Sequence, residues 1–374
     1  MSASELQILP GSPRPGVNVA ALESDWEALW SIPGTDGREA ATMQVRTLNL
    51  LVPALASDET WVMERLNPVL LSRPSRVIVL LHGSSAIPGL TSRATGICRV
   101  AGGSDGRLCC EEAIIEAAEG VPVEQMVQAV TPLVLPDLPT FLWWKHCLPV
   151  ASERQPLFDG LAALCERVIV DSAHSRDARA TLELLSQWVA TRSFRLSDWN
   201  WARLTPWREL TARLFDPPRC REQMQRIRRL HIDCIAGEDI GAQTLAMLYV
   251  GWLASRLQWQ VRAVEIMPER LLATFAVGDE PVHVSLETGC GHKTGLRKVR
   301  LVTDGAEFQI WLAEEEGMLR AESVLPEERK LVHAVPFRPQ EDAALLADEL
   351  DLMGRDSIYE QSLQKAVEVL AHSA

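Results

Sequence analysis

Residues 171–174 bring together the side-chain types of a nucleophilic catalyst. Asp171, Ser172 and His174 lie within four positions of one another. A serine nucleophile needs a base beside it and an acid that orients the base. One short turn cannot set three such side chains in that geometry, so the spacing argues against a triad. We expect a loop at the end of a strand there, with Ser172 or Ser175 capping the helix that follows.

Two glycine-containing loops could hold a phosphate group. Residues 289–295 (GCGHKTG) look like a phosphate-binding loop, but His292 separates the glycine from the lysine, and a strand follows instead of a helix. We expect this segment to be the loop of a hairpin. Residues 80–85 (LLHGSS) follow an apolar strand, but they lack the G-x-G-x-x-G pattern and Pro88 breaks any helix starting there. The sequence therefore favours a strand-exit loop without a ligand around Gly83.

Cysteine and histidine side chains offer few metal ligands. Cys290 and His292, with His283 nearby, could supply them, but no second pair has the spacing of a zinc site. The eight cysteines contain no C-x-x-C pair, and we expect them to be reduced thiols. The adjacent Cys109 and Cys110 point to opposite faces of a strand and cannot easily bridge each other. We expect no metal and no cofactor, and find no catalytic constellation.

Tryptophan is the dominant aromatic residue, with 12 Trp against 7 Phe and 2 Tyr, and it gathers in two segments. In residues 135–144 (LPDLPTFLWW), Trp143 and Trp144 must point to opposite faces of an extended chain, so one can be core and the other needs another partner. In residues 198–210 (DWNWARLTPWREL), apolar side chains share one helical face and arginines lie elsewhere. Core packing, contact with a protein partner and nucleic-acid stacking remain open, in that order of preference.

Strands and helices that alternate must position these segments. Residues 76–81 (RVIVLL) form a nearly continuous apolar strand, which is typical of a parallel sheet covered on both faces. Further strands are expected around residues 133–135, 140–144 and 168–170, with helices between them. The fold class is therefore α/β, with a mostly parallel α/β N-terminal domain followed by a mixed α+β C-terminal domain. We expect residues 1–16 to be a flexible tail, residues 17–192 the first domain and residues 193–374 the second.

Charge is unevenly distributed along the 374 residues. Lys plus Arg is 37 and Asp plus Glu is 50, so the net charge is 37 − 50 = −13, which argues against a general polyanion binder. Ten arginines lie between residues 192 and 229, whereas 16 acids face 6 bases from residue 304 onward. The second domain thus has a basic, Trp-rich start and an acidic end. Without a signal peptide or a long apolar run, we expect a cytoplasmic protein that binds neither membrane nor nucleic acid.

The two Trp-rich segments also carry a resemblance. The stretches LPDLPTFLWW and SDWNWARLTPWRELTARLFD resemble signature stretches of the OpcA family, the glucose-6-phosphate dehydrogenase assembly or activator proteins of cyanobacteria and actinobacteria. The stretches RTLNLLV, RPSRVIVLLHG, CCEEAIIEAAEG, ERVIVDSA and LYVGWLASRLQW support it in the family's order, from about residue 40 to 260.

This resemblance implies a protein that is not an enzyme. It would bind glucose-6-phosphate dehydrogenase, promote its oligomerisation and activate it allosterically in the oxidative pentose phosphate pathway. Thioredoxin is a second partner implied by cyanobacterial members, but no cysteine follows Cys290, so a regulatory pair near the C-terminus is absent here.

Interface hot spots are rich in Trp and Arg, which selects the residues expected to contact the dehydrogenase: Trp143, Trp144, Trp201, Arg203, Trp207 and Arg208. The alternative function is a sugar-phosphate or nucleotide-binding enzyme that uses the strand-exit loops near Gly83 and Asp171.

Overall fold

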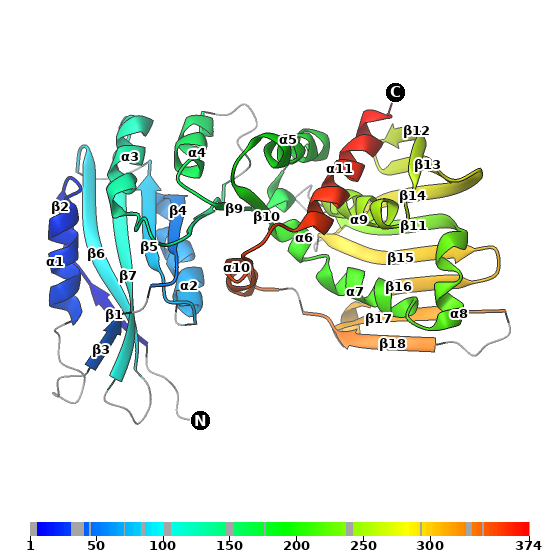
Figure 1. Ribbon diagram of the computed structural model, residues 1–374, viewed down its shortest axis with the longest axis horizontal. Coiled ribbons are helices and arrows are strands. Elements are labelled where there is room, and N and C mark those ends of the chain that lie inside the picture. The colour runs from blue at the N-terminus through cyan, green and yellow to red at the C-terminus, as the bar shows by residue number, and fades with distance from the viewer. Residues whose placement is uncertain are drawn as a thin grey trace. The chain divides into compact units, whose positions relative to one another are not determined.

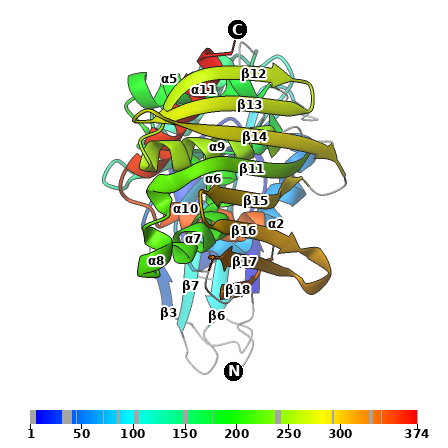
Figure 2. The same cartoon turned by 90° about the vertical axis from the view of Figure 1, so that its right-hand side faces the viewer.

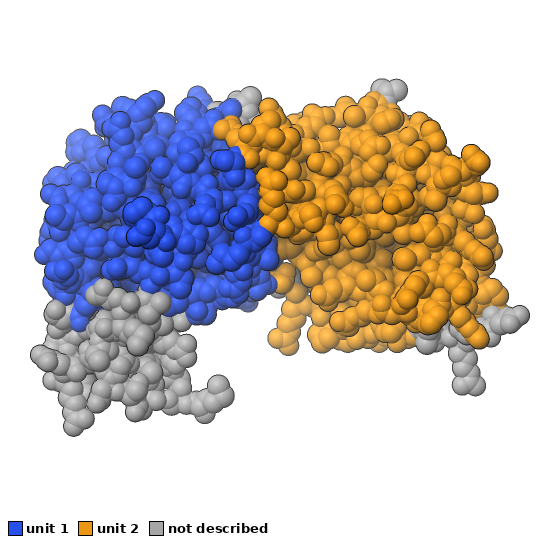
Figure 3. Space-filling view, in the orientation of Figure 1, with its two compact units in different colours: residues 1–170, 193–197, 341–354 blue, residues 171–192, 198–340, 355–374 orange. Residues whose placement is uncertain are grey.

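Two compact units make up the chain (Figure 3). The computed structural model describes residues 6–30, 41–44, 46–70, 72–83, 87–100, 106–146, 148, 153–175, 177–236, 242–291, 294–326, 331–338 and 340–373. Unit 1 comprises residues 1–170, 193–197 and 341–354, and unit 2 comprises residues 171–192, 198–340 and 355–374. This division differs from the expected boundary at residue 193, because residues 171–192 belong to unit 2 and residues 341–354 return to unit 1.

Unit 1 is built on a sheet in the order β1-β6-β7-β5-β4-β8-β9-β10, with β2 added to β6 and β3 to β7. Five neighbouring strands, β7-β5-β4-β8-β9, are parallel, as expected for a mostly parallel α/β unit. The strands are β1 (Leu6–Pro10), β2 (Arg14–Pro15), β3 (Ala41–Gln44), β4 (Asn49–Leu55), β5 (Arg76–His82), β6 (Leu90–Val100), β7 (Gly106–Ala117), β8 (Thr140–Trp143), β9 (Arg167–Val170) and β10 (Arg195–Asp198).

The chain reverses its direction of travel across this sheet at β4. It moves from β4 to β5 and β7 on one side, and later to β8, β9 and β10 on the other. Such a doubly wound order places a switch point between β4 and β8, where ligands of this architecture bind outside the carboxyl ends of the strands. Six of the seven residues of both β4 and β5 are buried, because helices cover both faces.

Helices and short 3₁₀ turns connect the strands of unit 1. Asn18 caps the first helix, since its Oδ1 accepts a 3.0 Å hydrogen bond from the backbone N–H of Ala21. The elements are α1 (Val19–Trp30), η1 (Ala56–Asp58), α2 (Glu59–Leu70), α3 (Val123–Val130), η2 (Thr131–Leu133), α4 (Gln155–Ala162) and α10 (Asp342–Leu350).

Two expectations for unit 1 are wrong. The expected tail, residues 1–16, contains β1, which pairs antiparallel with β6 along residues 6–10, and β2, which pairs with the same strand. The expected strand at residues 133–135 does not form either, since η2 ends at Leu133 and no strand follows before β8. Both errors arise because pairing with a distant strand, and not local apolar content, decides which short segments become strands.

Unit 2 is built on a second sheet, in the order β12-β13-β14-β11-β15-β16-β17-β18. Among the strand pairs of the described residues of unit 2, only β11 and β14 are parallel, so the expected mixed α+β architecture is confirmed. The strands are β11 (Ile227–Ala236), β12 (Gln260–Met267), β13 (Arg270–Val277), β14 (Glu280–Cys290), β15 (Gly295–Thr303), β16 (Glu307–Ala313), β17 (Met318–Val324) and β18 (Leu331–Pro336).

The helices of unit 2 cover one face of this sheet and leave the other face open, as Figure 2 shows with the open face toward the viewer. They pack on residues such as Leu230 and Ile232 of β11, which are buried. The elements are η3 (Ser172–His174), α5 (Ala178–Thr191), α6 (Trp199–Ala202), α7 (Thr205–Leu214), α8 (Pro218–Arg221), η4 (Met224–Arg226), α9 (Ala242–Arg256), η5 (Glu314–Glu316) and α11 (Ser357–Ala371) (Figure 1).

The glycine-containing segment 289–295 is not the loop of a hairpin. The strands before and after it, β14 and β15, pair with opposite edges of β11 and not with each other. β14 ends at Cys290 and β15 begins at Gly295, so a strand follows the segment and not the helix that a phosphate-binding loop requires. His292 itself lies outside the described residues.

The expectation that the cysteines are reduced thiols is wrong for one pair. Cys98 and Cys109 lie directly opposite each other on β6 and β7 and form a disulfide. Antiparallel neighbours bring their side chains together on one face, whereas the adjacent Cys109 and Cys110 do not bridge each other, as expected. Cys110, Cys165, Cys220 and Cys234 are buried and take no part in this disulfide, and Cys147 lies outside the described residues.

None of the helices in the described ranges combines the length and the apolar character that crossing a membrane requires.

The packing of α9 against α11 gives the first prediction. A Cβ added at Gly251 of α9 would lie 2.2 Å from the carbonyl oxygen of Ser362 and 3.1 Å from the backbone nitrogen of Ala366. Alanine favours a helix over glycine by about 1 kcal/mol. The two helix backbones would nevertheless have to separate. Overpacking of this kind costs roughly 1–3 kcal/mol, and the gain in helix propensity offsets only part of that cost. We expect Gly251→Ala to lower the denaturant midpoint of unit 2, measured by tryptophan fluorescence.

Gly305→Ala is the control for this prediction. An added Cβ at Gly305 would make only an ordinary 3.7 Å contact with the ring of Pro326. Equal midpoints for the two variants would show that the helices are not in such close contact.

Candidate functional site

All four tryptophans predicted to contact a partner are buried. Trp143 and Trp144 are 1 % and 0 % exposed, and Trp201 and Trp207 are 5 % and 2 % exposed. Trp143 and Trp144 do point away from each other, but the sheet of unit 1 is covered on both faces, so each finds a core partner. The ring of Trp143 lies 6.0 Å from that of Trp61 on α2. The burial favours the core-packing alternative for these side chains, while the partner role of the six residues stays a prediction.

Trp201 and Trp207 hold the start of the basic segment inside unit 2. The Nε1 of Trp201 donates a 2.8 Å hydrogen bond to Asp356, just before α11. The Arg208 guanidinium stacks 3.7 Å from the centre of the Trp201 ring, a cation–π contact. Burial lowers the pKa of Arg208, although nearby carboxylates oppose that shift. These aromatic faces are therefore covered and are not available for stacking on nucleotide bases.

Arg203 compensates a buried carboxylate. Its Nη1 and Nη2 donate hydrogen bonds of 2.7 Å and 2.8 Å to the two oxygens of Asp171, which is 7 % exposed. Burial opposes the ionisation of Asp171, but hydrogen bonds from His174 and Arg203 outweigh it and hold the pKa of Asp171 well below its usual range. The bidentate pair joins residues 32 positions apart, which the sequence pattern did not reveal.

A second buried carboxylate, Asp198, lies in the same part of unit 2. Its oxygens accept hydrogen bonds from the Ser172 backbone N–H (3.0 Å), the Ser172 hydroxyl (2.7 Å), the Asn200 N–H (3.0 Å) and the Tyr359 hydroxyl (3.3 Å). Burial raises the pKa of Asp198 to about 6, and the charge of Asp171 acts in the same direction. The network ties η3, α6 and α11 together.

The residue types at positions 171–174 do not form a catalytic arrangement. Ser172 is fully buried and donates to Asp198, whereas His174 pairs with Asp171 at 3.2 Å and lies half exposed. The Ser172 hydroxyl therefore faces the Asp198 carboxylate and not the His174 ring. The expected helix cap also differs, because Asp177, and neither Ser172 nor Ser175, accepts from the N–H of Ala180 at the start of α5.

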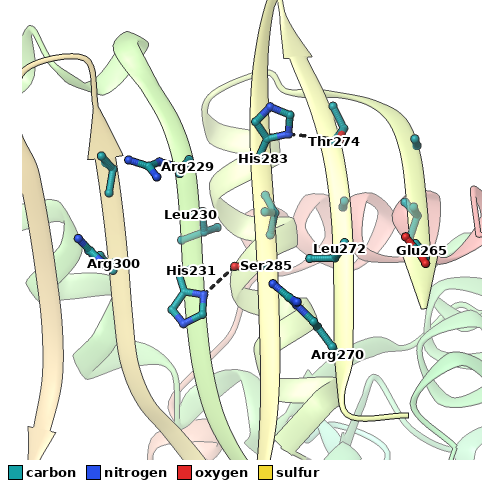
Figure 4. A pocket seen from close by; sticks show the side chains of 15 residues that line it. Arg229, Leu230, His231, Glu265, Arg270, Leu272, Thr274, His283, Ser285 and Arg300 are labelled. Carbon is teal, nitrogen blue, oxygen red and sulfur yellow. Dashed lines mark hydrogen bonds between the residues drawn. The ribbon is translucent and has the colours of Figure 1, made fainter. Parts of the chain in front are cut away.

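The open face of the second sheet carries the clearest accessible site of unit 2. A pocket of about 600 Å³ lies across β12, β13, β14, β11 and β15. Because strand side chains alternate, Arg229 and His231 point away from the helices, and the neighbouring strands add further cationic groups (Figure 4). The side chains that line this pocket, which we call the open-face pocket, include Arg229, His231, Glu265, Arg270, His283 and Arg300.

Arg229 is the cation of this pocket that is left for a partner. Arg300 pairs with Glu307 at 2.7 Å and Arg270 lies 3.5 Å from Glu287. Arg229 is exposed and has no ion pair within the described ranges. In the open-face pocket, Arg229 is thus the arginine open to a carboxylate of a partner, while Glu265 adds one negative charge to the lining.

His231, Asp233 and Glu287 lie close enough for one metal ion at the edge of this pocket. Both ring nitrogens of His231 already have partners, since Nδ1 lies 2.6 Å from the Ser285 hydroxyl and Nε2 lies 2.8 Å from Asp233. Arg270 also neutralises Glu287. These contacts fit a polar network of the sheet better than a metal centre.

The pairing of Arg203 with Asp171 gives the second prediction. Arg203→Met leaves the buried Asp171 without its guanidinium, and we expect a loss of about 2–3 kcal/mol in the free energy of unfolding at pH 7. Because the folded pKa of Asp171 is lowered, its stabilisation exists above the unfolded pKa of about 4 and is lost as pH falls. The difference between wild type and variant should therefore shrink below about pH 4, as measured by denaturant unfolding at several pH values.

Arg213→Met on α7 is the control, since Arg213 is 53 % exposed and its ion pair with Glu209 is long, at 3.9 Å. It should change stability by less than about 0.5 kcal/mol. A difference between wild type and Arg203→Met that persists unchanged into strong acid would contradict the ion-pair explanation.

Comparisons with known proteins give the family. Residues 67–187 match the model described as glucose-6-phosphate dehydrogenase subunit N-terminal domain, and residues 195–363 match the model of the C-terminal domain. The OxPP cycle protein OpcA of Synechococcus elongatus is 27 % identical over 89 % of this chain and 77 % of its own length. The protein of the same name from Nostoc punctiforme is 34 % identical over 61 % of this chain, but only 44 % of its own length is matched.

Similarity to solved structures concerns the fold alone. The transcriptional regulator Gal80p from Kluyveromyces lactis aligns with a TM-score of 0.50 and 11 % identity, over 88 % of this chain and 92 % of that one. An NAD binding oxidoreductase from Klebsiella pneumoniae aligns with a TM-score of 0.49 and 9 % identity, over 87 % of this chain and 96 % of that one. The two consecutive domain matches, which span most of the sequence, and the similarity to the cyanobacterial proteins show that this chain belongs to the OpcA family.

Proposed function

We propose that this chain is a non-catalytic protein of the oxidative pentose phosphate pathway that binds glucose-6-phosphate dehydrogenase, promotes its oligomerisation and activates it allosterically. The observation that carries the proposal is the match of both halves of the chain, in order, to domains described as parts of a glucose-6-phosphate dehydrogenase subunit. Activation by a bound protein requires that it binds the active state of the dehydrogenase more tightly than the inactive state.

The alternative function, a nucleotide-binding enzyme, fits the residues less well. In the doubly wound order of unit 1, the pyrophosphate of a dinucleotide would lie at the turn between β4 and α2, on the helix N-terminus. That turn (residues 55–59, LASDE) contains no glycine and ends in Asp58 and Glu59, which pair with Lys145 and Arg93 and so occupy the helix N-terminus where the pyrophosphate would lie.

Of the two loops that the alternative names, the one near Gly83 follows β5 and continues into residues outside the described ones. At the one near Asp171, the Ser172 hydroxyl is buried and donates to Asp198 instead of facing His174.

The open-face pocket is our choice for the contact with the dehydrogenase. It presents Arg229, which has no ion pair in the described ranges, and the described helices of unit 2 lie on the other face of this sheet. The partner surface that complements it carries acidic side chains. Arg203 is one of the six residues expected from the sequence to contact the dehydrogenase. Its charge reversal cannot test that expectation, since a glutamate there would lie beside the buried Asp171 and destabilise unit 2.

The third prediction concerns the dehydrogenase itself. Its activity at substrate concentrations below KM should rise when the chain is added, and its mass in light scattering should shift toward a larger oligomer. Both shifts follow if the chain binds the active, assembled state preferentially. An unchanged rate, apparent affinity and mass at saturating amounts of the chain would refute the proposed function.

The fourth prediction locates the contact. We expect Arg229→Glu to weaken the association at least tenfold, about 1.4 kcal/mol, in a binding titration against the dehydrogenase. Arg256→Glu makes the same charge change at an exposed position of α9, on the helix-covered side of the sheet, and should bind as wild type does. If both variants activate and bind equally well, the open-face pocket is not the contact.

A further inference from the structure

The two edge strands of the second sheet, β12 and β18, differ in how well they are protected against further pairing (Figure 2). An exposed edge strand presents unpaired N–H and C=O groups to any other strand that approaches it. Folded proteins usually protect such an edge with charged side chains, with proline, with a bulge, or by covering it with another segment. Most of this protection lies on β12, and little of it lies on the described part of β18.

Edge strand β12 is blocked in several ways. Its register with β13 shifts between Val261 and Ala263, and such an irregularity disrupts the pairing edge. Arg262 and Glu265 add charged side chains along the strand. On the side away from β13, residue 264 forms a parallel bridge with residue 373, beyond the end of α11. β12 therefore offers no continuous edge to a second chain.

Edge strand β18 is open, regular and uncharged. Its sequence (LVHAVP) contains no Lys, Arg, Asp or Glu, and its register with β17 runs without a shift. Within the described ranges, no strand pairs with the side of β18 that faces away from β17. Val332 is 51 % exposed and Ala334 is exposed as well. Only Pro336, at the last position, lacks an N–H for a further strand.

The backbone hydrogen bonds between β17 and β18 show which residues of β18 face outward. The N–H of Phe337 donates a 2.8 Å hydrogen bond to the carbonyl oxygen of Gly317, just beyond the last paired residues of the two strands. In an antiparallel pair, residues that exchange hydrogen bonds alternate with residues that do not. Every second residue before Phe337 therefore faces β17, so the N–H and C=O groups of Val332 and Ala334 point away from it.

The side chains at these two positions lie on the open face of the sheet. The ring of Phe337 lies on the helix-covered side, with its centre 6.4 Å from that of Trp207 on α7. Because side chains alternate along a strand, Val332 and Ala334 point to the opposite face. An identical strand paired antiparallel to β18 would add small apolar side chains beside them, without bringing like charges together.

One blocked edge and one open edge together select a second copy of this chain as the occupant. A sheet that is open at one edge only cannot extend into a filament, because the next molecule has no second edge to offer. Identical chains of this kind pair through the same edge, around a two-fold axis. In the antiparallel register that sets Val332 opposite Ala334 of the partner subunit, each of these residues donates and accepts a backbone hydrogen bond.

We propose that two copies of this chain form a symmetric dimer through antiparallel pairing of their β18 strands, which joins the two eight-stranded sheets into one. The two-fold axis is perpendicular to the joined sheet, so both open-face pockets lie on the same side of it. A contact of six residues per chain is small beside the roughly 20–30 residues a side of a standard interface, so the dimer dissociates on dilution. The dimer does not depend on the proposed association with the dehydrogenase.

Sedimentation velocity of the full chain alone, over a wide range of concentrations, tests this dimer. We expect a reversible equilibrium between one chain and two, with no larger species. Ala334→Pro removes the outward N–H from both copies without removing a hydrogen bond to β17, and edge strands tolerate proline at such positions. It should raise the dissociation constant of the dimer at least about tenfold, since one hydrogen bond per copy is lost. Ala334→Ser keeps the N–H and should dimerise as wild type does.

Val332→Lys adds a charge to the open edge, as natural edge strands do, and should prevent dimerisation. Ile266→Lys is the matched control, because Ile266 is 49 % exposed and lies on the blocked edge strand β12. It should leave the dimer unchanged. If Ala334→Pro does not fold, Val332→Lys decides, since that side chain is exposed.

Three outcomes would overturn the proposal. The first is a chain that stays monomeric at every concentration, and the second is a dimer that survives both Ala334→Pro and Val332→Lys or is lost equally in Val332→Lys and Ile266→Lys. The third is a series of larger oligomers, which would show that β12 also pairs and that the assembly is not a closed dimer.

Discussion

The arrangement of η3, α6 and α11 in unit 2 depends on one constraint, which is that two neighbouring buried carboxylates must both be compensated. Asp171 and Asp198 are 7 % and 1 % exposed, and each raises the electrostatic cost of ionising the other. Arg203 balances the first, while N–H and O–H donors from Ser172, Asn200 and Tyr359 satisfy the second. Because these donors come from η3, α6 and α11, the electrostatic requirement fixes how three elements meet. The same requirement accounts for the close spacing of Asp198, Asn200 and Arg203, which are an acid, an amide and a base.

Local patterns predicted most of the helices and the buried strands, since periodicity and apolar runs are visible within a short window. The continuous apolar stretch at residues 76–81 became β5, and the strands expected around residues 140–144 and 168–170 became β8 and β9. The failures share one cause, which is pairing over a long sequence distance. Residues 6–10 form a strand only because β6 lies beside them, and residues 289–295 do not close a hairpin because β14 and β15 pair with opposite edges of β11. Nothing in the neighbouring residues records either arrangement.

The candidate sites show the same limit. Alternation correctly separated Trp143 from Trp144, yet it could not reveal that helices cover both faces of that sheet and bury both rings. Arg203 was predicted to contact the dehydrogenase, but the pattern could not reveal its hydrogen bonds to Asp171, which lies 32 residues earlier in the chain. The open-face pocket depends on five strands, and their order cannot be obtained from the strands one at a time. A signal for Arg229 and His231 was nevertheless present, since charged residues alternate with apolar ones along β11.

Unit 1 keeps the strand order of a dinucleotide-binding sheet but not the turn that such a ligand requires. Asp58 ends η1 and Glu59 begins α2, so carboxylates already lie at the helix N-terminus where a pyrophosphate would bind. Asp58 also forms an ion pair with Lys145, which follows β8, so these two charges neutralise each other beside the switch point. Unit 1 thus combines the strand order of a ligand-binding sheet with a turn that contains no glycine, so its architecture alone does not determine its chemistry.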